Sequence, residues 1–414
     1  MASIEQAVDK LYKDHFGKMV SVLLYASRDI DLETAEDLVQ DSFSAALTDW
    51  KSNGIPLNPA GWIYKVCRNK ALNKIKKEKR IEGLDENTFH ESVEIRFSES
   101  ALDDQQLKLL FACAHPDLSP KVQVVITLKY VVNLKVDVIA GVLGMTLDGV
   151  DKLLLRARQK IRDEKILLEE PPPTALRPRL PTVHKIIYLI FNEGYKSFRG
   201  TEIIREELCE EALLLNKALM DAHLGTKDTA ALHALMLFNS ARFKSRFGLS
   251  GELLNLEKQD RSLWDKALIQ LGNDFLHASK GEEVTSYHLE ASIAFLHCAA
   301  HSFADTDWET ITQLYARLLK EHPNPFVELN YAIALFYSGQ RPQAFQILHG
   351  LERHPILNQY YLLNSALGKL HHLEGNDDLA RQYLMKACEQ TGFAKEREFI
   401  EKMIAEIDGG ASFP

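Results

Sequence analysis

Cysteine is scarce in this chain of 414 residues, and the few cysteines stand apart from one another. The sequence has no Cys-x-x-Cys pair and no cluster of histidine with cysteine; its five cysteines are Cys67, Cys113, Cys209, Cys298 and Cys388. This spacing fits reduced thiols rather than a disulfide framework or a zinc site. We therefore expect no disulfide, no metal and no cofactor.

Long apolar runs are also missing. No segment approaches the roughly 20 apolar residues that cross a bilayer, and the first residues, MASIEQAVDKLYKDHF, lack the charged-then-apolar design of a signal peptide. An excess of positive charge is absent too, since the formal net charge is -9. This balance argues against a general nucleic-acid binder, and we expect a soluble, cytoplasmic protein that binds no membrane.

The charge is unevenly distributed along the chain. Residues 1–168 hold 24 basic and 25 acidic side chains, whereas the remaining residues hold 25 and 33. Between positions 65 and 80, eight Lys or Arg stand against Glu78 alone. Because a cationic helical face attracts the phosphate backbone, any contact with nucleic acid should be local to this stretch.

Two helical patterns meet at this basic stretch. In 35–50 the apolar residues recur at helical spacing, at Val39, Phe43, Ala46, Leu47 and Trp50. That stripe leaves an outward face of Asp37, Gln40, Asp41 and Ser44. After a turn at 54–59, a second buried stripe is predicted at Ile63, Cys67, Ala71 and Ile75. Trp62 and Tyr64 begin that helix, and rings beside basic groups can stack on unpaired bases. A merely solvated face is the alternative interpretation.

A helix-turn-helix is predicted further along. Ser119 and Pro120 suit the start of a helix to about position 132, followed by helices over 136–143 and 147–164 with a turn at 144–146. The small core of the motif would contain Ile139, Ala140, Leu143, Val150 and Leu154. The last helix carries Lys152, Arg156, Arg158, Lys160 and Arg162, and such a helix normally enters the major groove.

Two stretches interrupt the helical patterns. Residues 82–104 carry eight acidic side chains against Arg96 alone, which predicts an extended acidic linker. Residues 169–182 carry Pro171, Pro172, Pro173, Pro178 and Pro181, which predict extended geometry and an end to helix formation. We therefore expect domains at 1–81 and 105–168.

The remaining half of the chain has only helical patterns, over 183–285 and 286–408. Near its end Ala332, Gly339, Ala344 and Leu348 recur 36 residues later as Gly368, Gly375, Ala380 and Leu384, which predicts stacked helical hairpins of tetratricopeptide type. An ordinary helical bundle is the alternative. His184, Glu193, His223, His233 and Asp260 form no catalytic spacing such as His-Glu-x-x-His, so we expect no enzyme activity.

The first two helices resemble region 2 of the extracytoplasmic-function sigma factors. AEDLVQDSF from Ala35, WIYK from Trp62 and RNKALN from Arg68 are close to the usual wording of that family. The resemblance implies an all-α fold. It implies contact with RNA polymerase core at Asp37, Leu38, Gln40, Asp41 and Phe43. Contact with promoter DNA at the minus-ten element is implied at Trp62, Tyr64, Lys65, Arg68, Asn69 and Asn73, and we add the basic residues Lys76, Lys77 and Arg80.

The helix-turn-helix resembles region 4 of the same family, since LLLRARQKIR matches its usual close. This implies that the last helix reads the minus-thirty-five element, and we expect contacts from Thr146, Asp148, Asp151, Lys152, Leu155, Arg156, Arg158 and Lys160. The sequence 149–153 departs from the family, because an acid, Asp151, stands where a basic or polar group is usual. Asp151 could accept a hydrogen bond from a cytosine amino group or weaken contact there.

The linker and the C-terminal half complete the resemblance. In the family the linker follows the polymerase channel, although a solvated tether fits the composition equally. LIFNEGY from Leu189, PFVELNYAIAL from Pro325 and EREFI from Glu396 resemble a subgroup with a tetratricopeptide-like extension. This implies a sigma factor regulated by its own extension, which would pack on the sigma domains or bind a protein or peptide. A stand-alone helix-turn-helix regulator with a sensing domain is the alternative.

Overall fold

The computed structural model describes residues 3–27, 30–81, 95, 97, 99–143, 145–166, 168, 171–195, 206–248 and 251–409, with the side chains at 78–81, 99–105 and 142 left aside. Within these ranges every regular element is a helix, and a single isolated antiparallel bridge joins Phe247 to Leu253. The predicted all-α class is confirmed. The chain forms two compact units, Met1–Leu224 and Gly225–Pro414.

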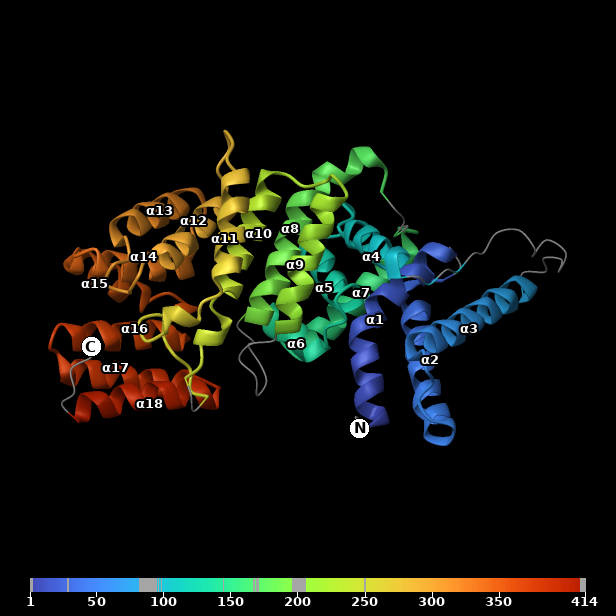
Figure 1. Ribbon diagram of the computed structural model, residues 1–414, viewed down its shortest axis with the longest axis horizontal. Helices are drawn as coiled ribbons and strands as arrows, with labels where there is room; N and C mark the ends of the chain where they lie inside the picture. The colour runs from blue at the N-terminus through green and yellow to red at the C-terminus, as the bar shows by residue number, and fades with distance from the viewer. Residues whose placement is uncertain are drawn as a thin grey trace. The chain divides into compact units, whose positions relative to one another are not determined.

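Three long helices open the first unit: α1 (Ile4–Ala26), α2 (Leu32–Asn53) and α3 (Pro59–Ile81), drawn in blue in Figure 1. Their ends follow from local chemistry. Ser3 forms a capping box with Gln6, and the Asp31 carboxylate accepts from the Thr34 N–H at 2.8 Å. Gly54 ends α2 with a φ of 80°, a conformation that glycine adopts at little cost.

The helix-turn-helix follows, after α4 (Glu99–Cys113), as α5 (Pro120–Tyr130), α6 (Val136–Val142) and α7 (Leu147–Asp163). Ser119 caps α5 as predicted, and Thr146 caps α7 by accepting from the Gly149 N–H at 3.1 Å. The predicted limits of these helices are confirmed to within two residues.

The prediction of an extended proline-rich joint is wrong for residues 173–182. They form the first half of α8 (Pro173–Tyr195), with Pro178 and Pro181 inside the helix. A proline inside a helix costs about 3 kcal/mol. The cost is offset because α8 packs against α4, α5 and α9 (Glu206–Asp221) and buries six large apolar side chains, each contributing roughly 1.5–3 kcal/mol: Leu180, Val183, Ile186, Ile187, Ile190 and Phe191.

The acidic linker is shorter than predicted. Helix α4 begins at Glu99, inside the stretch 82–104 that the composition assigned to the linker. Acidic residues are also favoured in the first turn of a helix, where they face the positive end of its dipole, so composition alone could not place this boundary. Residues 82–94, 96 and 98 of the predicted linker lie outside the described residues.

The second unit is a succession of helices: α10 (Lys227–Ser240), α11 (Lys266–Ala278), α12 (Ser286–Ala299), α13 (Trp308–Glu321), α14 (Pro325–Tyr337), α15 (Arg341–Leu351), α16 (Tyr361–Leu373), α17 (Asp377–Gln390) and α18 (Ala394–Asp408). Successive helices pack against one another, and α16, α17 and α18 lie side by side in Figure 1. None of the helices in the described ranges has the length and apolar content that a membrane crossing requires.

The sequence repeat corresponds to two consecutive hairpins, α14–α15 and α16–α17. Gly339 and Gly375 occupy equivalent turns with φ values of 89° and 77°. Ala332 and its counterpart Gly368 lie at equivalent places in the first helix of each hairpin. At Gly368 a Cβ would stand 2.6 Å from Leu384 Cγ, so this helix pair approaches too closely for a side chain. The tetratricopeptide likeness itself remains a prediction.

Candidate polymerase and nucleic-acid interface

Helix α2 presents the acidic outward face that the sequence predicts. Asp37, Gln40 and Asp41 are exposed, and the Asp41 carboxylate lies 3.3 Å from the ammonium of Lys70 on α3. Leu38 and Phe43, the two apolar members of the predicted polymerase site, are buried instead. The Phe43 ring packs edge-on against Tyr12 with centroids 5.0 Å apart. Leu38 and Phe43 therefore pack in the core. A protein that binds this face of α2 would contact the exposed side chains of Asp37, Gln40 and Asp41 instead.

Helix α3 separates a buried stripe from a basic face. Its predicted stripe is buried at Ile63, Cys67, Ala71 and Ile75. The predicted minus-ten residues of the opposite face are exposed at Lys65, Arg68, Asn69, Asn73, Lys76 and Lys77. The side chain of Arg80 lies outside the described residues. Burial raises the pKa of Cys67 to about 12, so its thiol remains protonated and belongs to the core.

The two aromatic residues at the start of α3 are not open stacking platforms. Trp62 is half-buried and packs edge-on against Trp50 with centroids 5.7 Å apart. The Tyr64 hydroxyl forms a 2.8 Å hydrogen bond with His15 Nδ1, and its ring stacks on Phe97 at 5.1 Å with an angle of 12°. Sequence reasoning missed Phe97, because it stands in the stretch assigned to the linker.

Helix α7 exposes one part of its predicted DNA-binding set. Asp148, Asp151, Lys152, Leu155 and Arg156 are exposed, and the Lys152 ammonium lies 2.7 Å from the Asp148 carboxylate. Thr146 is also exposed, but its hydroxyl caps the helix. The acid Asp151 is therefore as accessible as the two cations, and its role towards DNA remains a prediction.

The two remaining cations of the set bind other parts of the protein. The Lys160 ammonium donates to the Asp117 carbonyl at 2.7 Å. The Arg158 guanidinium donates from Nε to the Tyr130 hydroxyl at 2.6 Å and from Nη2 to Glu36 Oε2 at 2.9 Å. Arg158 therefore makes no DNA-facing surface in this structure.

Glu36 is the centre of a buried ionic cluster, which we call the Glu36 cluster: Glu36, Lys129, Tyr130 and Arg158. Glu36 is 7% exposed, and its second oxygen, Oε1, lies 2.8 Å from the Lys129 ammonium. Burial raises the pKa of Tyr130 well above its ordinary value, so its phenol is neutral and can accept from Arg158. The cluster joins α2 to both α5 and α7.

Sequence reasoning missed the Glu36 cluster, although a signal was present. Glu36 is three residues before Val39 and seven before Phe43, so it falls on the apolar stripe of α2 rather than on the outward face. An acid on such a stripe must find a cationic partner when the helix packs, because an unpaired buried carboxylate is strongly unfavourable.

The histidines and acids without catalytic spacing are accounted for by burial, backbone conformation or a local hydrogen bond. His184, Glu193 and His233 are buried in their helices. His223 has a φ of 57° just after α9. Asp260 accepts from the Ser262 N–H at 2.8 Å, and this hydrogen bonding keeps the pKa of its carboxyl below the usual value.

Comparison with known proteins matches three segments to family models. Residues 11–81 match Sigma-70 region 2, residues 108–161 match Sigma-70, region 4, and residues 179–280 match a family of unknown function, DUF6596. The first segment contains α3, and the second contains α5, α6 and most of α7. The third begins within α8 and ends after α11.

Two curated relatives extend these matches. The uncharacterized protein R00370 of Rhizobium meliloti (strain 1021) is 33% identical over 328 residues, which cover 76% of this chain and 76% of that protein. A match of that length must extend beyond the helix-turn-helix into the C-terminal half. The RNA polymerase sigma factor SigV of Bacillus subtilis (strain 168) is 26% identical over 130 residues, or 31% of this chain and 75% of SigV. No solved structure matches.

Proposed function

We propose that this chain, which belongs to the sigma-70 family and is a sigma factor for promoter-specific transcription initiation, is controlled by its own C-terminal half. RNA polymerase core and promoter DNA are its partners. The finer proposal assigns one task to each exposed surface of α2, α3 and α7 and a regulatory task to the helices from α8 onward.

Helix α2 would bind polymerase core through its exposed acidic face, Asp37, Gln40 and Asp41. Helix α3 would read and melt the minus-ten element through its exposed basic face. The observation that carries this assignment is the adjacency of the two faces, since Asp41 on α2 lies 3.3 Å from Lys70 on α3. One surface can therefore engage an acid-binding protein site and a phosphate backbone at the same time.

Helix α7 would contact the minus-thirty-five element through Lys152 and Arg156, with Asp151 reading or disfavouring a base between them. Arg158 would join them only after it leaves Glu36. The contribution of Arg158 to the upstream contact therefore depends on a rearrangement of the Glu36 cluster.

The C-terminal half would act by supporting the helix-turn-helix. Arg179 on α8 donates to the Phe111 carbonyl of α4 at 2.7 Å, and the buried Gln106 amide donates to the Glu211 carboxylate of α9 at 2.6 Å. Helices beyond residue 170 thus complete the core beside α4 and α5, which favours required support over simple inhibition.

Transcription in vitro with purified polymerase core on a genomic library tests the sigma activity. The Asp37→Lys/Asp41→Lys protein should lose binding to core while it keeps its helical content. The matched control is Glu5→Lys/Asp14→Lys, which makes the same charge change at exposed positions of α1. Specific binding of the protein to duplex DNA without polymerase would favour the stand-alone regulator instead.

Truncation tests the regulatory part. A fragment that ends at Leu224 retains α8 and α9, whereas a fragment that ends at Glu170 lacks both. We expect the longer fragment to fold and bind core, and the shorter one to lose cooperative unfolding of the helix-turn-helix. If the shorter fragment folds and transcribes like the full chain, the C-terminal half does not control activity.

A further inference from the structure

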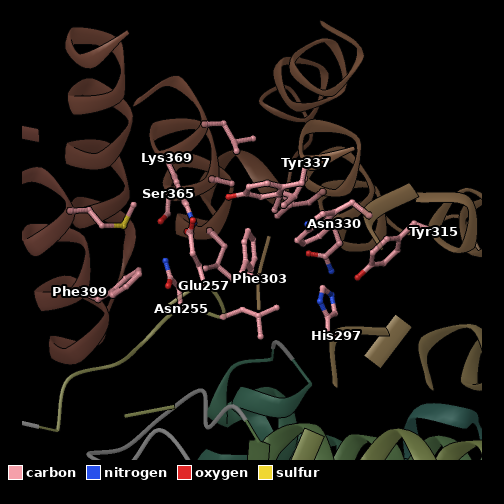
Figure 2. A pocket seen from close by; sticks show the side chains of 18 residues that line it. Asn255, Glu257, His297, Phe303, Tyr315, Asn330, Tyr337, Ser365, Lys369 and Phe399 are labelled. Carbon is pink, nitrogen blue, oxygen red and sulfur yellow. The ribbon is translucent and has the colours of Figure 1, made fainter. Parts of the chain in front are cut away.

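The second unit contains a cavity of about 380 Å³ that none of the family matches explains. It lies among α12, α13, α14, α16 and α18, and the segment that carries Asn255 and Glu257 forms another part of its wall. Figure 2 shows side chains from these helices directed around the ring of Phe303. The volume is at the lower end of the range of pockets for small organic ligands, about 300–1,000 Å³.

One part of the cavity wall is a cluster of aromatic rings. The rings of Trp308 and Tyr337 stack at 4.8 Å with an angle of 25°, and Phe303 packs edge-on against both, at 5.1 and 4.9 Å. Ile333 and Leu362 add aliphatic surface. Such walls fit a flat apolar ring, because aromatic pairs gain from stacked and edge-on contacts beyond the area they bury.

A charged pair stands in this apolar surrounding. Among the described residues that line the cavity, Lys369 and Glu257 are the charged ones, and they form an ion pair with side chains only 16% and 17% exposed. The Lys369 ammonium lies 5.8 Å from the Phe303 ring centroid and 5.9 Å from that of Tyr337. Lys369 therefore already provides a cation beside the Phe303 and Tyr337 rings.

A second polar group lies at the other end of the cavity. His297 lines it opposite Asn330 in Figure 2, and its Nδ1 atom is buried with no hydrogen-bond partner among the described residues. Burial, together with the charges of Arg242 and Arg261, lowers the pKa of His297 to about 3, so the ring is neutral.

These features select the charge of the ligand. A cation would have to displace Lys369 from the Phe303 and Tyr337 rings, whereas an anion could replace Glu257 as the partner of Lys369 while that ammonium stays beside the rings. We propose that this cavity binds a small aromatic anion, with its ring against Phe303, Trp308 and Tyr337 and its acidic group on Lys369. This inference rests on the proposed regulatory role of the C-terminal half and names the chemistry of its effector. Release of Glu257 would be the first structural consequence of binding.

Two fluorescent probes with the same rings test the proposal on the full-length chain. 1-Anilinonaphthalene-8-sulfonate carries an anionic group, and N-phenyl-1-naphthylamine lacks it. The variants are Glu257→Gln, which leaves Lys369 without its acid, Lys369→Met, which removes the cation, and the double variant, which removes both charges. Ala366→Trp places a large ring at a half-buried position of the cavity wall and controls for probe bound elsewhere.

The anionic probe should bind roughly tenfold more tightly to Glu257→Gln and roughly tenfold more weakly to Lys369→Met and to the double variant, as expected for one charge-assisted hydrogen bond. The neutral probe should respond to neither charge change, and both probes should be lost from Ala366→Trp. The double variant keeps the test valid if Lys369→Met alone unfolds, because it leaves no unpaired carboxylate.

Absence of saturable binding, equal effects on both probes, or tighter anionic binding to Lys369→Met would each overturn the proposal. None of these outcomes depends on polymerase. If the probes do not bind as expected but truncation abolishes activity, the ligand is rejected and the regulatory role stands. If the probes bind as expected but truncation leaves activity unchanged, the regulatory role alone is rejected.

Discussion

The Arg158 guanidinium on α7 donates a 2.9 Å hydrogen bond to the Glu36 carboxylate on α2, and so ties the helix-turn-helix to the helix proposed to bind polymerase. The minus-ten and minus-thirty-five elements are about 25 base pairs apart, or roughly 85 Å at 3.4 Å per base pair. If α3 and α7 bind these two elements as proposed, the contact between Arg158 and Glu36 would hold them too close together to reach both. We therefore expect the Glu36 cluster to open when both elements are bound.

The first prediction concerns Glu36→Gln. The amide keeps the shape of the side chain but removes the charge between Lys129 and Arg158, so the closed arrangement should lose about 1–3 kcal/mol. We expect a lower Tm for the free protein together with faster formation of the promoter complex by the holoenzyme. The measurements are thermal unfolding and stopped-flow promoter binding.

Glu33→Gln is the matched control, because Glu33 lies 3.9 Å from Arg158 but is 56% exposed. It should change neither quantity much, since exposed ion pairs contribute little. A promoter complex that forms no faster with Glu36→Gln, despite a lower Tm, would show that the cluster only stabilises the fold.

The second prediction concerns the stacked pair of Tyr64 and Phe97. Phe97 covers one face of the ring that the sequence analysis assigned to melted DNA, and base stacking on such a ring contributes about 1–3 kcal/mol per base. Phe97→Ala should therefore speed the formation of open complex more than it changes closed-complex binding. Permanganate reactivity of promoter thymines follows the melting step.

The double variant Phe97→Ala/Tyr64→Ala provides the control. If Phe97 acts by covering Tyr64, its removal should have no effect once Tyr64 is absent. An equal acceleration with and without Tyr64 would mean that Phe97 obstructs DNA by another route and that Tyr64 is not a stacking platform.

The sequence predicted the surfaces of α2 and α3 because burial repeats at helical spacing. Val39 and Phe43 in α2 and Ile63 and Cys67 in α3 form stripes that require no knowledge of their partners. The same reasoning placed Asp37 and Asp41 outside. Local periodicity is therefore sufficient for the helices and for their exposed faces.

Long-range pairing was beyond the same reasoning. Arg158 was predicted to face DNA because it is one of the basic residues of its helix. In the structure it binds Glu36 and Tyr130, which are 122 and 28 residues away in sequence. The helix through Pro178 and Pro181 was missed for a related reason, since tertiary burial of α8 outweighs a local cost. In both cases the decisive contacts lie outside any local window of sequence.

The third prediction compares two glycines in the paired hairpins. Gly368→Ala on α16 would place a Cβ 2.6 Å from Leu384 Cγ and 3.0 Å from the Ala380 carbonyl, so it should destabilise the second unit by about 1–3 kcal/mol. Gly350→Ala on α15 has open space around the new methyl group and should stabilise by roughly 0.5–1 kcal/mol. Opposite shifts in urea midpoint are expected; a shift of the same sign in both would contradict the close approach of α16 and α17.

The last prediction concerns stability against pH at His297. Burial and the nearby Arg242 and Arg261 lower its pKa to about 3 in the folded protein, whereas the unfolded chain has the ordinary value of about 6.5. Between these values the unfolded state binds more protons, so the contribution of His297 is full above about pH 6.5 and is lost as the pH falls towards 3. The slope attributable to this ring should approach, at most, about 1.4 kcal/mol per pH unit.

His297→Asn should flatten the fall in unfolding free energy between pH 6.5 and 4.5. The slope from other histidines, including His115 and His371 with their lowered pKa values, should persist in both proteins. Identical slopes for the two proteins would show that folding does not lower the pKa of His297.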